Sequence, residues 1–145
     1  MKILHVLRAP VGGLFRHVAD LAGGQIARGH EVGIIADSTG GNALSEAALA
    51  ALAPKLALGL TRIPIQRNPH PADIAAVWRV ARRVHDTGAE IVHGHGAKGG
   101  ALARLAPCAR RIVRVYTPHG GNLHDEVGSS LHLLMERVLM PLGQL

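Results

Sequence analysis

Short apolar runs alternate along this chain with longer stretches in which apolar residues recur every three or four positions. The runs are nearly continuous, as in strands that are buried on both faces of a sheet. The third run is the weakest of the five, because Gly59 and Pro64 interrupt it. The pattern predicts five strands, at residues 2–7, 31–36, 58–65, 90–93 and 112–116.

The stretches between and after these runs have the apolar periodicity of amphipathic helices. Gly29 and Gly88 stand where a left-handed residue commonly ends a helix. Helices are predicted at residues 14–28, 42–53, 71–87, 97–105 and 131–142, with a turn over 10–13. In the third helix the apolar residues Ile74, Val77, Trp78, Ala81 and Val84 are expected to face inward, and Arg79, Arg82, Arg83 and Asp86 to face water. The apolar stripe of the last helix either docks on the sheet or lacks the element that would cover it.

Regular alternation of strands and helices predicts one Rossmann-like α/β domain with a parallel sheet and helices on both faces. The usual strand order for this arrangement is 3-2-1-4-5, which places the first and fourth strands at the switch point of the sheet. Ligands of such sheets bind in the crevice at the carboxyl ends of the strands. Three motifs, at residues 11–13, 91–96 and 117–121, are predicted to lie where a strand gives way to a turn or helix, and a fourth, at residues 28–32, leads into a strand.

Two glycines, Gly12 and Gly13, lie between the first strand and the first helix. Glycines at that position let backbone N–H groups approach an anion at a helix N-terminus. The alternative is that the turn needs glycine for its geometry alone. The surrounding residues match neither a dinucleotide-binding fingerprint nor a P-loop.

Three histidines form the second candidate site. His93 and His95 are two residues apart and would project to one face of an extended segment. With His119 as a third ligand they could bind zinc, although the alternative is that they are core or turn histidines. His119 is placed to hydrogen-bond a sugar hydroxyl or to exchange a proton, or else to cap its turn. Lys98, among four nearby glycines, could help a helix N-terminus to hold an anion.

Composition narrows the function classes. The net charge of +6 favours anionic partners such as phosphorylated ligands or an acidic membrane, although solvated surface charge accounts for most of the basic residues. Aromatic residues are only 2% of the chain, so no stacking platform for single-stranded nucleic acid is expected. The single Cys108 is expected to be a buried small side chain, and the chain is expected to be cytoplasmic.

Taken in order, these motifs resemble the amino-terminal domain of the retaining glycosyltransferase family four, which has the GT-B architecture. The residues that carry the resemblance lie in segments 2–6, 12–22, 28–32, 91–100 and 117–120. No single motif is specific, but the ordered set spans nearly the whole chain. It is most similar to bacterial enzymes that build cell-surface polysaccharides and glycolipids.

The resemblance implies an acceptor-binding domain that works with a second, donor-binding domain. It implies that the turn at Gly12 and Gly13 approaches the diphosphate of a nucleotide-sugar and that His119 is the active-site histidine near the transferred hexose. It also makes His17, His95, Lys98 and Gly120 candidates for binding the acceptor or the sugar. The nucleotide-sugar is a co-substrate, and neither a cofactor nor a metal is expected. Acceptors of this family are often lipid-linked, so Arg79, Arg82 and Arg83 could contact an anionic membrane.

The segment that holds the donor in this family is not found in these 145 residues. We therefore expect an incomplete amino-terminal domain that alone transfers no sugar and that needs a donor-binding domain in cis or in trans. Two alternatives stay open. One is a non-catalytic nucleotide- or phosphate-binding module, and the other is a subunit that pairs with a separate donor-domain chain.

Overall fold

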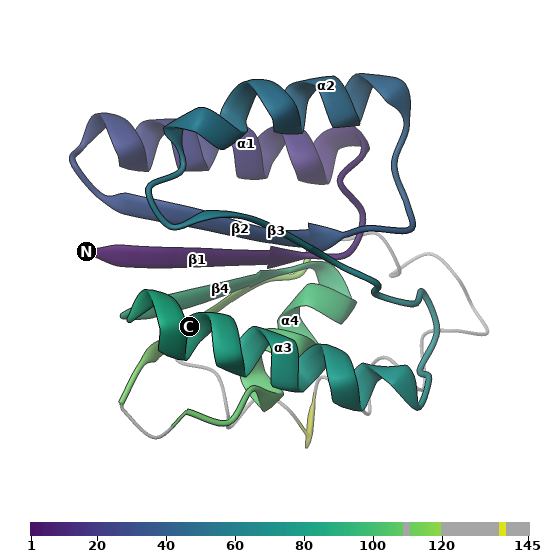
Figure 1. Ribbon diagram of the computed structural model, residues 1–145. Coiled ribbons are helices and arrows are strands. Elements are labelled where there is room, and N and C mark those ends of the chain that lie inside the picture. The colour runs from purple at the N-terminus through teal and green to yellow at the C-terminus, as the bar shows by residue number, and fades with distance from the viewer. Residues whose placement is uncertain (109–110, 120–136, 139–145) are drawn as a thin grey trace.

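Five parallel strands form the centre of the molecule. The computed structural model describes residues 1–108, 111–119 and 137–138, and shows helices on both faces of the sheet (Figure 1). The strands are β1 (Lys2–Leu7), β2 (Glu31–Asp37), β3 (Gly59–Ile63), β4 (Ile91–His95) and β5 (Val113–Thr117). The helices are α1 (Gly12–Ala27), α2 (Ala43–Leu52), the 3-10 turn η1 (Ala53–Lys55), α3 (Ala72–Thr87) and α4 (Gly96–Leu105).

The strand order is β3-β2-β1-β4-β5 and every neighbouring pair is parallel, which confirms the predicted topology. β1 and β4 are therefore the central neighbours at the switch point, with His5 paired to His93 and Leu7 to His95. α1 and α2 cover one face of the sheet, and α3 and α4 cover the other (Figure 1). The predicted last helix at 131–142 lies outside the described residues except for positions 137 and 138.

Local sequence signals explain where the helices begin and end. Asn42 caps α2, because its side-chain oxygen accepts a hydrogen bond from the backbone N–H of Ser45. The backbone N–H of Asn42 donates in turn to the Ser45 hydroxyl. Gly29 and Gly88 both adopt positive φ just after α1 and α3, as predicted. The element bounds differ from prediction by a few residues, and two of the differences affect the site: α1 begins at Gly12 rather than after the glycine pair, and β4 continues through His95.

Glycines let α4 lie directly on the sheet. A Cβ at Gly94 of β4 would stand 2.6 Å from the Cα of Gly100, and one at Gly99 would overlap the carbonyl oxygen of Val6. A Cβ at Gly100 would likewise overlap the ring of Tyr116 in β5. Gly94 and Gly99 are thus required by the close approach of one backbone to another, and Gly100 makes room for the Tyr116 ring.

The outward face of α3 differs from the prediction. Ile74 and Trp78 were expected to face inward, yet their side chains are 67% and 63% exposed. The buried positions of α3 are instead its smaller residues, Ala76, Val80, Ala81 and Val84, which pack with Leu4, Val6 and Val92 of the sheet. Because the buried stripe is centred near Val80, the two larger side chains fall on its flank.

Arg83 and Cys108 also differ from expectation. Arg83 was expected to face water, but its guanidinium is partly buried and donates a 2.6 Å hydrogen bond to the carbonyl oxygen of Leu58. Cys108 was expected to be buried and is partly buried against the core on the α3 and α4 side. Desolvation raises the pKa of its thiol, which therefore stays protonated near neutral pH.

Candidate functional site

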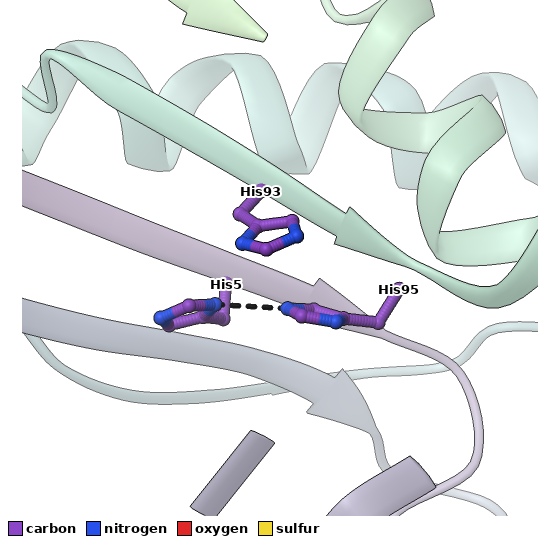
Figure 2. A group of neighbouring side chains, drawn as sticks. All are labelled: His5, His93 and His95. Atoms are coloured by element: carbon purple, nitrogen blue, oxygen red, sulfur yellow. Dashed lines mark hydrogen bonds between the residues drawn. The ribbon is translucent and has the colours of Figure 1, made fainter. Parts of the chain in front are cut away.

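Five histidines gather where β1, β4 and β5 meet the amino-terminal half of α1. His5 comes from β1, His93 and His95 from β4, His17 from α1, and His119 from the residues just after β5. The rings of His93 and His95 have centroids 4.0 Å apart, so the expectation that they share one face is confirmed. Figure 2 shows His5, His93 and His95 grouped close together, with a hydrogen bond between His5 and His95.

Hydrogen bonds join three of these histidines and one glutamine into a line of side chains. The line runs from the interior to the edge of the sheet. The Gln25 Oε1 lies 2.8 Å from His5 Nε2, and His5 Nδ1 lies 2.9 Å from His95 Nε2 (Figure 2). His95 Nδ1 in turn lies 3.1 Å from His119 Nε2. His93 stands beside this line and bonds to the Thr117 hydroxyl at 2.8 Å.

The amide oxygen of Gln25 fixes the direction of this line. A carbonyl oxygen only accepts, so His5 Nε2 must carry the proton and donate it. A neutral His5 then accepts at Nδ1, so His95 donates from Nε2 and accepts at Nδ1. His119 donates from Nε2 to His95, which leaves the lone pair of its own Nδ1 available to a ligand.

Burial keeps these rings neutral. Desolvation, followed by the nearby histidines, lowers the pKa of His95 to about 2 and that of His93 to about 4. Desolvation also lowers the pKa of His5 and of His119, with His17 adding to the effect in both. In the part of the chain that the structure describes, no ion pair joins these five rings to a carboxylate.

His119 has a strained backbone at this edge. Its φ of 59° makes it the one non-glycine residue with positive φ among the described residues. That conformation costs roughly 1 kcal/mol or more for an ordinary side chain, and such strain clusters at functional sites. Strain at the residue that ends the hydrogen-bonded line therefore points to a role in function for the placement of His119.

Gly12 and Gly13 lie at the same edge of the sheet. Both are exposed, and a Cβ added to either would meet no atom within 4 Å. Gly12 has a φ of 64° and needs glycine for its conformation, whereas Gly13 does not. His17, one turn further along α1, has its ring centroid 5.0 Å from that of His119. The first turns of α1 and the end of β5 thus face one another.

Lys98 does not join this group. Its ammonium forms an ion pair with Asp73 of α3 and donates to the carbonyl oxygen of Asn68 at 2.8 Å. The lysine therefore ties the start of α4 to the loop before α3. Gly120, the last of the candidates, lies outside the described residues.

Sequence reasoning missed His5 and Gln25, although a signal was present. His5 interrupts an otherwise apolar run in the central strand, and a buried imidazole needs hydrogen-bond partners.

A polar hollow at the end of β2 was also missed. It is lined by Ser38, Thr39, Gly40, Gly41, Asn42, Ala43 and Glu46.

Comparison with known proteins decides the family. The model of the family described as Glycosyltransferase Family 4 matches residues 11–142 of the chain. The chain belongs to this family. Over 64 residues it is 45% identical to EpsD of Bacillus subtilis (strain 168), which is named as a glycosyltransferase. That stretch covers 40% of this chain and 16% of EpsD.

Solved structures agree on the fold of this family 4 chain. It superposes on S. aureus MnaA, known in a co-structure with UDP, with a TM-score of 0.69 and 12% identity over 99% of this chain and 38% of MnaA. With MurG of Acinetobacter baumannii the TM-score is 0.58 and the identity 19%, over 80% of this chain and 34% of MurG. These likenesses confirm the Rossmann-like fold of the amino-terminal half of GT-B proteins. The chain spans less than two-fifths of either structure.

The lowered histidine pKa values predict that acid destabilises this family 4 chain. In the unfolded chain each histidine titrates near pH 6.5, whereas folded His93 stays neutral down to about pH 4. As the pH falls from about 6.5 to about 4, His93 binds a proton in the unfolded state but stays neutral in the folded state. The free energy of unfolding should drop by up to about 1.4 kcal/mol per pH unit for each such histidine.

Urea denaturation between pH 7.5 and pH 4.5 measures this slope. Asparagine does not titrate, so His93→Asn should lower the slope of the unfolding free energy against pH by up to about 1.4 kcal/mol per pH unit. This expectation holds even if the substitution changes the stability at pH 7.5. His85→Asn is the matched control, because the His85 side chain is 86% exposed. Equal slopes for His93→Asn and wild type would show that His93 is not held neutral by the fold.

Proposed function

We propose that this chain is the acceptor-binding part of a retaining glycosyltransferase that transfers a hexose from a nucleotide-sugar in bacterial cell-surface polysaccharide or glycolipid synthesis. Membership of the family supports the reaction class. The observation that carries the proposal is that α1, which begins at the exposed glycine turn, brings the ring of His17 to a centroid distance of 5.0 Å from that of His119, whose backbone has a positive φ. A donor-binding domain, in cis or in trans, would form the opposite wall of the site.

In this proposal backbone groups bind the diphosphate of the donor, and a side chain binds its sugar. Backbone N–H groups at Gly12 and Gly13, with the positive end of the α1 dipole, suit the diphosphate of the donor. His119 Nδ1 suits a hydroxyl of the transferred sugar, because its lone pair can accept that hydroxyl's proton in a hydrogen bond. A neutral imidazole does this without attracting the diphosphate away from the glycines.

Retention requires the acceptor oxygen to bond to the anomeric carbon on the face that the diphosphate leaves. As the bond from that carbon to the diphosphate oxygen breaks, the acceptor hydroxyl transfers its proton to the departing phosphate. No side chain has to accept that proton, which agrees with a site built from neutral imidazoles and backbone groups. His119 and the glycines would position the reactants and stabilise the charge that develops on the phosphate.

A substitution at Gly13 tests the binding part of this proposal. Gly13→Ala fits the fold, because its Cβ would meet no protein atom, but the methyl group would occupy the space proposed for the diphosphate. With UDP-glucose, UDP-N-acetylglucosamine and GDP-mannose as probes, NMR of the wild type should show shifts at the Gly12 and Gly13 amides and at the His119 ring. Gly13→Ala should weaken this binding at least tenfold.

The matched control is Gly23→Ala, further along α1, where a Cβ likewise meets no atom within 4 Å. It should bind the probes as the wild type does, and neither protein should transfer sugar to an acceptor without the donor domain. Binding that survives Gly13→Ala unchanged would refute the glycine turn as the diphosphate site. Sugar transfer by the isolated chain would refute the need for a second domain.

A second function, peripheral membrane contact, is favoured by the outer face of α3. Ile74, Trp78 and Arg82 follow one another at intervals of four residues, and Arg79 lies beside Trp78. An exposed tryptophan with flanking arginines suits the interface of an anionic bilayer. Within the described residues, no helix has both the length and the apolar character that crossing a bilayer requires. We propose that α3 holds the chain at the inner face of the membrane, near a lipid-linked acceptor.

Vesicle sedimentation tests this contact. Wild type should sediment with vesicles that contain phosphatidylglycerol and should stay in solution with pure phosphatidylcholine. The double variant Ile74→Ser, Trp78→Ser should lose most of the sedimented fraction. Leu44→Ser, which removes an 80% exposed apolar side chain from α2 on the other side of the sheet, should not. Equal sedimentation with both lipids would exclude the membrane proposal.

A further inference from the structure

Three of the clustered histidines face one another at the edge of the sheet from three separate segments. His17 of α1, His95 at the end of β4 and His119 after β5 each offer a ring nitrogen within 4.8 Å of the other two. His95 is buried, His119 is partly buried and His17 is exposed. The group is therefore anchored on the sheet and open toward the solvent.

The spacing of two of these nitrogens already matches a tetrahedral metal site. His95 Nδ1 and His119 Nε2 are 3.1 Å apart. Two nitrogens bound to one zinc ion at about 2.0–2.1 Å lie roughly 3.3–3.4 Å apart in tetrahedral geometry. An ion to one side of the line between the two nitrogens could thus take the place of the shared proton, provided that both rings turn to point their electron pairs at it. The exposed side chain of His17 can then move to complete a set of three.

The interior side of the group has the outer partners that metal-binding histidines need. His95 donates from Nε2 to His5, which fixes its tautomer and leaves Nδ1 without a proton, with the electron pair that accepts the hydrogen bond from His119. His5 is fixed in the same way by Gln25. Such hydrogen bonds orient a ligating imidazole and typically contribute 10–100-fold to metal affinity.

A second set of nearby histidines fits an ion less well. His5, His93 and His95 also lie within reach of one another, but all three are buried. Their facing nitrogens are engaged: His5 Nδ1 with His95 Nε2, and His93 Nε2 with Thr117. A divalent charge there would be desolvated, and in the described part of the chain no carboxylate bonds to these three rings to compensate it. The open set at the edge is the better site.

We propose that His17, His95 and His119 form a binding site for a divalent transition-metal ion of zinc type, with one coordination position left open. Nitrogen ligands from three histidines plus an open position suit zinc, cobalt(II), nickel(II) and copper(II) rather than magnesium or calcium. The site does not depend on the proposed sugar chemistry. If that chemistry also holds, a bound ion would occupy His119 and compete with the donor sugar.

Metal titration of the whole 145-residue chain tests the site. With Zn²⁺ in competition with a chromophoric chelator, the wild type should bind one equivalent, and Co²⁺ should give the intense visible absorption of four-coordinate cobalt. His17→Ala removes an exposed ligand without touching the core and should weaken Zn²⁺ binding at least tenfold. His119→Ala should weaken it similarly, whereas the control His85→Ala on exposed α3 should bind as the wild type does.

Two results would overturn the proposal. One is a wild-type chain that takes up no stoichiometric Zn²⁺ at micromolar concentration. The other is Zn²⁺ binding that persists at wild-type strength in both His17→Ala and His119→Ala, which would place the ion elsewhere. Circular dichroism of each variant shows whether it is folded, and the exposed His17 keeps the test decisive even if His119→Ala unfolds.

Discussion

The structure depends on one constraint, the burial of imidazoles in the centre of a parallel sheet. A buried polar ring needs hydrogen-bond partners, and a buried charge needs a counterion. Here one acceptor, the Gln25 amide oxygen, sets the proton positions of His5, His95 and His119 in turn. Among the residues that the structure describes, the neutral rings satisfy one another without a carboxylate, and His119 presents the electron pair of Nδ1 at the edge of the sheet.

The rest of the fold serves to hold that line in place. Parallel pairing of β1 with β4 sets His5 opposite His93, and pairing of β4 with β5 sets His95 opposite Thr117, two residues before His119. Gly94, Gly99 and Gly100 allow α4 to press on these strands from the other face. α1 then brings both Gln25 and His17 over the histidines, at the inner and outer ends of the line.

Much of this could be predicted from the sequence because it follows from periodicity. The five strands, their order, the helix ends at Gly29 and Gly88, and the shared face of His93 and His95 are consequences of apolar spacing and glycine placement. In α3 the predicted burial of Ala81 and Val84 is confirmed, but that of Ile74 and Trp78 is wrong, because close packing against the sheet is centred on the smaller residues around Val80. The partners of His5 and Lys98 could not be predicted, since Gln25 and Asp73 meet them only through tertiary contacts.

The account's central claim is the direction of the imidazole line, and nitrogen-15 NMR of the metal-free chain at pH 7.5 tests it most directly. Long-range proton–nitrogen correlations distinguish the two neutral tautomers of each ring and the charged form. The account predicts neutral His5, His95 and His119, each with its proton on Nε2. A proton on Nδ1 of His95, or a charged imidazolium at that position, would contradict it.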